Sequence, residues 1–364
     1  MYKDKTIAVV VPAYNEEKQI GMVIENMPEF VDRIVIVNDG SKDDTAKIVC
    51  SYITQSCKSN VSIPWRTKKN SNSIYDKADV ILENIRAQEE SLYPVHEIYN
   101  DNTEDRIILI NEDNSGVGSA IAMGYKWCRD HDIDCTAVMA GDGQMDPNEL
   151  EMIIKPVCTE AIDYVKGNRL AHKAAKIMIP RQRHFGNSAL SLLTKVASGY
   201  WTVSDTQTGY TAISNRALNK IELYDIYPRY GCPNDILIKL NIENCTIREI
   251  PIKPVYAVGE QSKMKIFKVI PTISWLLIRG FFRRIIEKYF KKSFHPLFLF
   301  YMSGLFMAVL DLPILVKIVY NVLIKNGTVT LGYYMAFILL TLFSFQSIGF
   351  AMWMDIQDND KLCR

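Results

Sequence analysis

The chain has 364 residues, of which 48% are hydrophobic, and its formal net charge is +1. That length suits one large domain with an appendage, or two domains. A charge so close to zero excludes the global positive field that nucleic-acid binding relies on. The eight cysteines have no CxxC spacing and no histidines at ligand spacing. We therefore expect reduced thiols in a cytosolic compartment, and neither disulfides nor a zinc site.

Two strand–loop–helix units open the chain. The apolar runs at 6–11 and 34–37 have the pattern of strands buried on both faces of a parallel sheet. A polar loop and a helical pattern follow each run, which predicts an α/β fold with a doubly wound, mostly parallel sheet. Ligands of such sheets bind outside the carboxyl ends of the strands. Tyr14, Glu16 and Asp39 all lie at such ends.

Asp39 and the loop at 114–119 each allow two interpretations. Asp39 is either a turn residue beside Gly40 or a carboxylate that accepts hydrogen bonds from a base or a ribose. The loop carries two glycines in the spacing of a dinucleotide fingerprint, but Ile121 occupies the place of the third. A Rossmann dehydrogenase is therefore the weaker alternative, and we expect the glycines to allow close helix–strand packing beside a nucleotide.

Residues 56–104 interrupt this rhythm. They are mostly polar, with a basic cluster at 66–69 and one helical pattern at 76–90. A structureless loop of this length is uncommon inside a compact domain. We interpret the segment as an insertion that could act as a helical flap.

The loop at 140–147 is the central feature of the sequence. An apolar run at 136–139 precedes it and an amphipathic run at 149–157 follows, which predicts strand, acidic loop and helix. Asp146 has the position of a helix N-cap, and Glu149, three residues later, completes the spacing of a capping box. We expect these two acids to have that structural role.

Asp142 and Gln144 are left over by this assignment. They alternate with glycines that would let a ligand approach the backbone. Mg²⁺ and Mn²⁺ prefer oxygen ligands, and Mg²⁺ commonly takes only one or two carboxylates while water and substrate phosphate complete its shell. One interpretation is a carboxylate and an amide oxygen presented to a metal–diphosphate, and the other is a solvated turn.

Basic and polar residues follow the next two strand patterns. Arg169 ends a strand pattern, and Arg183 lies in a short basic span; each could bind phosphate oxygens in a fork. Their other interpretation is as solvated cations or as contacts to lipid headgroups. A polar cluster at 205–209 precedes another strand. Asn234 and Asp235 precede a helix predicted at 236–241, which either of them could simply cap.

The C-terminal third is far more apolar. Residues 266–292 form a basic, amphipathic pattern typical of a helix at a membrane interface. Two apolar spans follow, at 296–316 and 331–354, each long enough to cross a bilayer. The Lys/Arg cluster before the first span places that side in the cytoplasm. Asp311 within that span would face a protein partner or a polar cavity, which leaves homo-oligomerisation through the spans open.

Five motifs, in this order, resemble those of the inverting family 2 glycosyltransferases. The nearest branch is similar to dolichyl-phosphate mannose synthases and other polyprenyl-phosphate glycosyltransferases. The motifs are VVPAYNE at 10–16, VNDGS at 37–41, NSGVG at 114–118, GDGQ at 141–144 and DTQTG at 205–209. The resemblance covers about 1–265 apart from the insertion.

The resemblance implies a GT-A, Rossmann-like catalytic domain that takes a nucleotide-sugar (UDP- or GDP-linked), a polyprenyl phosphate (dolichyl or undecaprenyl) and Mg²⁺ or Mn²⁺. By position, the nucleotide would be held by Pro12, Tyr14, Glu16, Val37, Asp39 and Gly141. Asp142 and Gln144 would bind metal and diphosphate, Asp205 and Asp235 would orient sugar or acceptor, and Arg169, Arg183 and Lys263 would contact phosphate.

The implied organisation is a catalytic domain at 1–265 on the cytoplasmic face, juxtamembrane helices at 266–294, a transmembrane hairpin at 295–355 and a cytoplasmic tail at 356–364. Ala140 stands where the family carries the first acid of Asp-x-Asp-x-Gln, so the metal would depend on Asp142. The Gln-x-x-Arg-Trp of processive synthases is absent from the sequence. Two alternatives stay open: transfer to a glycolipid or polysaccharide hydroxyl, and a non-catalytic nucleotide-sugar binder.

Overall fold

The computed structural model describes residues 1–54, 59, 61–63, 76–101, 104–175, 181–255, 266–325 and 328–364. For residues 181–189 and 266–269 only the helical backbone is described. Lys263 therefore lies outside the described residues, and Arg183 is placed by its backbone alone.

A single eight-stranded sheet forms the centre of the N-terminal domain, with strand order β3-β4-β2-β1-β5-β7-β6-β8. The strands are β1 (Ile7–Ala13), β2 (Arg33–Asp39), β3 (His96–Tyr99), β4 (Ile107–Glu112), β5 (Cys135–Val138), β6 (Tyr164–Asn168), β7 (Thr211–Ser214) and β8 (Ile247–Pro251). Only β3 and β7 run against the common direction, because their pairings with β4, β5 and β6 are antiparallel and the other pairings are parallel. The predicted α/β fold class is confirmed, with a mixed sheet.

Helices cover both faces of the sheet. They are α1 (Ile20–Glu25), α2 (Thr45–Thr54), α4 (Val117–Asp130), α5 (Leu150–Thr159), α8 (Asn215–Leu218) and α9 (Cys232–Ile242), and α7 (Arg181–Ser198) packs on the outside of α9. One hydrophobic core joins the sheet to α4, α8 and α9, and a second joins it to α1, α2 and α5. Val35 and Ile36 belong to different cores. The run at 34–37 in β2 is therefore apolar because the strand is buried on both faces, as predicted.

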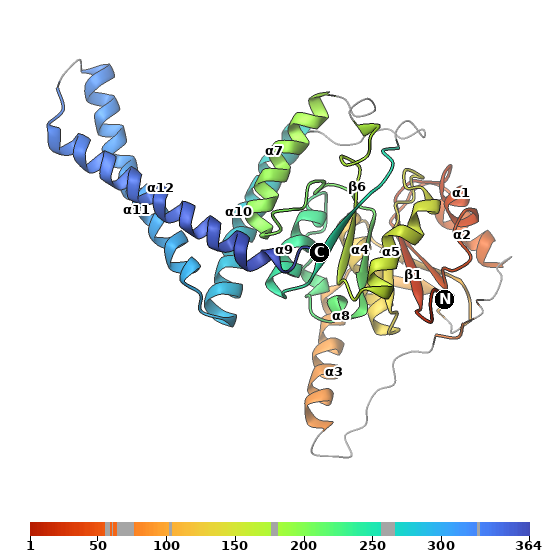
Figure 1. Ribbon diagram of the computed structural model, residues 1–364. Helices are drawn as coiled ribbons and strands as arrows, with labels where there is room; N and C mark the ends of the chain where they lie inside the picture. The colour runs from red at the N-terminus through yellow and green to blue at the C-terminus, as the bar shows by residue number, and fades with distance from the viewer. Residues whose placement is uncertain are drawn as a thin grey trace.

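The insertion contributes one predicted element and one that was missed. Helix α3 (Lys77–Glu89) matches the helical pattern, has no buried residue and projects from the body in Figure 1. Strand β3 was not predicted, because its four residues alternate only between partly buried and exposed. It pairs antiparallel with β4 and is the outermost strand on that side of the sheet. The proposed action as a flap stays a prediction.

The C-terminal third forms a long helical hairpin beside the sheet domain. Helix α10 (Ile266–Ile286) continues as π-helix through Glu287–Lys292, and α11 (Pro296–Val319) and α12 (Leu331–Asp360) follow. Within the segments 296–324 and 331–360, an apolar 18-residue stretch has a mean hydropathy of 2.0 and 1.8, and only 17% and 11% of that stretch is buried. The hairpin extends away from the sheet (Figure 1), as expected for membrane-spanning helices and not for core helices.

Helix α10 has the predicted amphipathic character. From Trp275 on, its exposed large apolar side chains recur every three or four residues at Trp275, Ile278, Phe282 and Ile286, followed by Phe290 in the π-helical segment. On the opposite face Ile273 and Leu277 are buried against α7 and α9. This arrangement fits a helix that lies in a membrane interface with its inner face on the domain.

Candidate active site

Loops that carry the candidate residues meet at one edge of the sheet. Strands β1, β2, β4, β5 and β6 share one direction, so their carboxyl ends, and the loops after them, lie on the same side. The segment 205–209 reaches this edge as well, because antiparallel β7 begins there. The structure therefore brings together motifs that are far apart in the sequence.

The loops after β1 and β2 are joined by backbone donors. The Asn15 N–H donates to Ser41 Oγ (3.0 Å), and the Glu16 N–H donates to Thr45 Oγ1 (2.9 Å). Asn15 adopts a φ of 55°, which turns the chain sharply between Tyr14 and Glu16. Both predicted nucleotide-binding side chains thus lie on a well-fixed loop and are half-buried.

Pro12 and Val37 differ in what they can offer a ligand. Pro12 is partly exposed, and its carbonyl oxygen accepts from the Gly141 N–H (3.3 Å), which ties β1 to the acidic loop. The Val37 side chain is fully buried in the core beneath α4. The side chain therefore packs in the core, and the predicted contact of Val37 with a nucleotide stays a prediction.

Asp39 orders the start of helix α4. Its carboxylate accepts from the Ser115 N–H (2.6 Å) and from the Gly116 N–H (3.0 and 3.1 Å). Gly116 has a φ of 104°, and a Cβ there would lie 2.4 Å from the Pro228 carbonyl oxygen. Burial raises the pKa of Asp39, while these backbone donors oppose the rise. The glycines of this loop therefore allow close approach to the segment at 227–232, and the expected helix–strand packing beside a nucleotide stays a prediction.

Glu112 is a neighbour that the sequence reading missed. It is paired with Asp39 across β4 and β2, and it is 5% exposed. Neither carboxylate oxygen has a hydrogen-bond partner among the described residues. Burial, with the charge of Asp39, raises the pKa of Glu112 to about 8, so the group carries a proton at neutral pH. An acid at the end of an apolar strand was the available signal.

The acidic loop is held as a tight turn. The Gln144 N–H donates to Asp142 Oδ1 (3.0 Å), and the intervening Gly143 has a φ of 72°. The Ala140 N–H points at the Met145 sulfur (3.2 Å). Asp142 and Gln144 are both half-buried. The turn keeps the carboxylate and the amide side chain on one short segment beside the carbonyl of Pro12.

The prediction for the helix after this loop was half right. Asp146 is the N-cap of the turn Pro147–Glu149, and its carboxylate accepts from the Asn148 N–H (2.9 Å). The capping box was wrong, because the Glu149 carboxylate instead accepts from the Lys253 N–H (3.0 and 3.2 Å). A donor from beyond β8 takes the acid that the local pattern assigned to the helix start.

The donor set suits a divalent cation only in company with a phosphate ligand. No group of three or more His, Cys, Asp or Glu side chains in the described part of the chain is arranged to hold a metal ion. Asp142 and Gln144 together offer one carboxylate and one amide oxygen. Mg²⁺ accepts so few protein ligands when waters and a diphosphate complete its octahedral shell. The residues present therefore fit the expected Mg²⁺ or Mn²⁺.

Arg169 and Asp205 form a partly buried ion pair at the same edge of the sheet, with the carboxylate buried and the guanidinium about a quarter exposed. The guanidinium donates to both carboxylate oxygens (2.8 and 3.0 Å), and the Arg169 N–H adds a third bond (3.0 Å). Burial pushes the pKa of Asp205 up, but the bonds and charge of Arg169, with the charge of Lys166, lower it overall. Asp205 is therefore ionised and held, and it in turn fixes the guanidinium that was predicted to bind phosphate.

Two residues that were not predicted hold the segment 205–209 in place by hydrogen bonds. Glu249 Oε1 accepts from the N–H groups of Ser204 (2.9 Å) and Asp205 (3.0 Å). The fully buried Lys166 donates to the Thr208 carbonyl oxygen, and burial lowers the pKa of Lys166 to about 8. The sequence signal was a lysine in the middle of a predicted strand.

Asp235 has a structural role, and its neighbour faces the site. Helix α9 begins at Cys232, four residues before the predicted start, so Asp235 lies in the first turn. Its carboxylate accepts from the Tyr227 N–H (2.9 Å), and burial raises its pKa. Asn234 Oδ1, by contrast, accepts from Gln207 Nε2 (3.0 Å). The residue that links α9 to the segment 205–209 is therefore Asn234.

Comparison with known proteins places the chain in a family. The family model "Glycosyl transferase family 2" matches residues 8–70 and 70–222. The chain is 31% identical over 255 residues, 70% of its length and 87% of the relative's, to UDP-N-acetylglucosamine–dolichyl-phosphate N-acetylglucosaminyltransferase of Methanococcus voltae. It is 23% identical over 261 residues (71% and 87%) to undecaprenyl-phosphate mannosyltransferase of Micrococcus luteus.

A solved structure is similar over a comparable share of the chain. Glucosyl-3-phosphoglycerate synthase from Mycobacterium tuberculosis, in complex with phosphoglyceric acid, has a TM-score of 0.48 and 19% identity, and the match covers 77% of this chain and 80% of that one.

Proposed function

This chain belongs to glycosyltransferase family 2, and on that premise we propose that it transfers a sugar from a nucleotide-sugar to a polyprenyl phosphate, with inversion, at the cytoplasmic face of a membrane. The observation that carries the proposal is the junction of two features in one chain. A sheet edge gathers the loops that hold acidic, amide and basic side chains, and the same chain ends in an interfacial helix and two long apolar helices.

The names of the relatives support the acceptor class. The Methanococcus voltae relative is named for transfer to dolichyl phosphate, and the Micrococcus luteus relative for transfer to undecaprenyl phosphate. Both matches span 87% of the relative's length. UDP-N-acetylglucosamine is the first donor to test.

On this proposal the donor lies across the strand ends. The loops after β1 and β2 hold the nucleoside, and Gly141 allows the diphosphate to approach the backbone. Asp142 and Gln144 would hold Mg²⁺ or Mn²⁺, which when bound neutralises charge on the departing diphosphate. The tight turn at 142–144 keeps both side chains oriented before the donor arrives, so that little reorganisation is needed during the reaction.

The acceptor phosphate attacks the anomeric carbon from the face opposite the diphosphate. A bond forms between the phosphate oxygen and the anomeric carbon, the bond to the diphosphate oxygen breaks, and the nucleoside diphosphate leaves. A phosphate is already ionised at neutral pH, so no general base is needed. Arg183 and Lys263 would hold the acceptor phosphate, and Asp205 positions Arg169 for the same purpose.

The test uses the full chain in detergent with Mn²⁺ or Mg²⁺, a panel of UDP- and GDP-sugars, and undecaprenyl or dolichyl phosphate. Mass spectrometry of the lipid and release of nucleoside diphosphate are the two readouts. We expect a lipid-linked monosaccharide with one donor, and none with Asp142→Ala. Glu151→Gln, an exposed change on α5, is the control.

Other outcomes would overturn the proposal. Product on a glycolipid or polysaccharide hydroxyl, and none on polyprenyl phosphate, would establish the alternative acceptor. Tight nucleotide-sugar binding in calorimetry with no turnover on any acceptor would establish the non-catalytic binder.

A further inference from the structure

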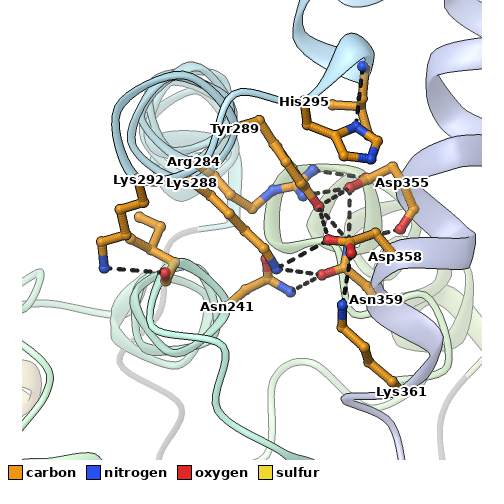
Figure 2. Close-up of polar contacts among 12 residues, drawn as sticks. Asn241, Arg284, Lys288, Tyr289, Lys292, His295, Asp355, Asp358, Asn359 and Lys361 are labelled. Atoms are coloured by element: carbon orange, nitrogen blue, oxygen red, sulfur yellow. Dashed lines mark hydrogen bonds and ion pairs between the residues drawn. The ribbon is translucent and has the colours of Figure 1, made fainter.

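A buried polar cluster joins the membrane hairpin to the sheet domain (Figure 2). We call it the interface cluster. It consists of Asn241 from α9, Arg284 from α10, Lys288 and Tyr289 from the π-helical segment, and Asp355 and Asn359 from α12. Each of these residues is at most 4% exposed. None of them belongs to the candidate active site.

Arg284 is the centre of the cluster. Its guanidinium donates to both carboxylate oxygens of Asp355 (2.7 and 2.9 Å) and to the carbonyl oxygens of Ala197 (2.9 Å) and Val196 (3.1 Å). Those carbonyls belong to the last turn of α7, where a cation is favoured by the helix dipole. One side chain therefore fixes α7, α10 and α12 to one another.

The other members extend the same connection to α9. Lys288 Nζ donates to Asn241 Oδ1 (3.0 Å) and Asn359 Oδ1 (2.7 Å). The Tyr289 hydroxyl donates to Asp355 Oδ1 (3.0 Å), and Asn359 Nδ2 donates to the same oxygen (2.8 Å). The two faces of the interface are thus connected by several bonds between charged or amide groups.

The chain end strengthens this attachment. Beyond α12, the Leu362 carbonyl oxygen accepts from the Ile247 N–H (2.7 Å), and the Arg364 N–H donates to the Ile247 carbonyl oxygen (3.0 Å). The Leu362 side chain lies in the core of the sheet domain. The second span is therefore fixed at its end to both the helices and the sheet.

Such a cluster is more than a tether requires. Two spans hold a protein in a bilayer whatever linker precedes them. A buried ion pair adds little net stability over packed apolar side chains, because removing both charges from water is costly. What it adds is a defined geometry. If the two charges separate, each is left buried without a partner, so only an orientation that keeps them together is stable. The carboxylate of Asp355 must meet Arg284 in one orientation of the hairpin relative to α7 and α10.

We propose that Arg284 and Asp355 are positioning residues that set the orientation of the sheet domain over the bilayer, so that an embedded polyprenyl phosphate reaches the strand edge. This inference rests on the proposed function. Helix α7 begins at Arg181 and so carries the predicted phosphate contact Arg183, and α10 begins just after Lys263. The cluster fixes both helices against α12. An embedded phosphate has a fixed height, whereas a soluble one diffuses to the site in any orientation.

The test compares two acceptors for the full chain in liposomes of phosphatidylglycerol and phosphatidylethanolamine. One is embedded undecaprenyl phosphate, and the other is citronellyl phosphate, a short soluble isoprenoid phosphate. The variant is the double change Arg284→Met/Asp355→Leu, which removes both charges and keeps apolar volume. Asp355→Asn is the second variant, and Lys361→Ala, an exposed change at the same end of α12, is the control.

We expect the double variant to lose at least tenfold in kcat/KM on undecaprenyl phosphate and to stay within twofold of wild type on citronellyl phosphate. Spin labels on α2 and on α11 should give a broader distance distribution in this variant than in wild type. Equal losses on both acceptors, or no loss on either, would overturn the inference. If wild type uses neither acceptor, the proposed function fails by itself, and unchanged spin-label distances would then reject the positioning role independently.

Discussion

Glu112 and Asp39 are directly paired across β4 and β2, and both are buried carboxyl groups at the carboxyl ends of these strands. The two residues differ in their partners. Asp39 accepts three backbone hydrogen bonds, whereas both oxygens of Glu112 lack partners within the described structure. Two ionised carboxylates at this spacing repel each other, so the pair is most stable with one proton, held by Glu112.

This pairing predicts a pH-dependent stability. The folded pKa of Glu112, about 8, lies above its ordinary value of 4.5, so the folded state holds a proton that the unfolded state releases between these values. The contribution of Glu112 to the free energy of unfolding is then fully present below pH 4.5. It is lost as pH rises to 8, by up to about 1.4 kcal/mol per pH unit. Glu112→Gln should remove this loss. Thermal unfolding of the full chain in detergent should show the variant gaining on wild type from pH 5 to pH 9, and a constant difference would contradict the assignment.

A second prediction concerns the metal site. Asp142→Ala should abolish sugar transfer with an unchanged melting temperature, because the turn keeps only one carboxylate for the diphosphate-bound metal. Ala140→Asp should act in the opposite direction and strengthen Mn²⁺ binding in the presence of nucleoside diphosphate by about tenfold, since a second carboxylate adds charge at the site. A turnover assay and thermal unfolding test Asp142→Ala, and calorimetric titration with Mn²⁺ in the presence of nucleoside diphosphate tests Ala140→Asp. Wild-type turnover in Asp142→Ala would remove the metal hypothesis.

The ion pair between Arg169 and Asp205 gives a third prediction. Asp205→Asn removes the negative charge that accepts hydrogen bonds from the Arg169 guanidinium. It should lower the free energy of unfolding by about 1.5–3 kcal/mol, a value typical of hydrogen bonds to charged groups. We expect a KM for the phosphate acceptor that rises at least tenfold, because Arg169 loses its orientation. Arg248→Ala removes an exposed ion pair with Glu160 and is the control, with an expected effect within about 1 kcal/mol. Equal effects of the two variants on KM would argue against a positioning role for Asp205.

How much of this was predictable depends on the range of the interactions. The strand at 34–37 and the N-cap at Asp146 were correct because burial on both faces and helix capping leave local patterns. The capping role of Glu149 was wrong because its partner, Lys253, lies 104 residues away. Arg284 and Asp355 are 71 residues apart, and no local pattern connects them. Glu112 and Lys166 were visible only as charges in apolar strands, without any sign of which group they would face.

The close approach of helix α4 to a distant loop supplies the last prediction. A Cβ built at Gly118 would lie 2.0 Å from the Tyr227 carbonyl oxygen and 2.9 Å from Cys232 Cβ, far inside van der Waals contact. Both contacts involve atoms that cannot rotate away, so Gly118→Ala must displace α4 from the loop before α9. Because α4 begins at the groups that Asp39 orders, we expect a loss of about 1–3 kcal/mol in stability, as overpacking typically costs, together with weaker nucleotide binding.

Gly349→Ala, where a Cβ meets nothing within 4 Å, is the matched control and should leave both quantities unchanged. Melting temperature and nucleoside diphosphate affinity measure the two effects, and a Gly118→Ala protein that behaves like Gly349→Ala would show that this contact does not hold the nucleotide side of the edge in place.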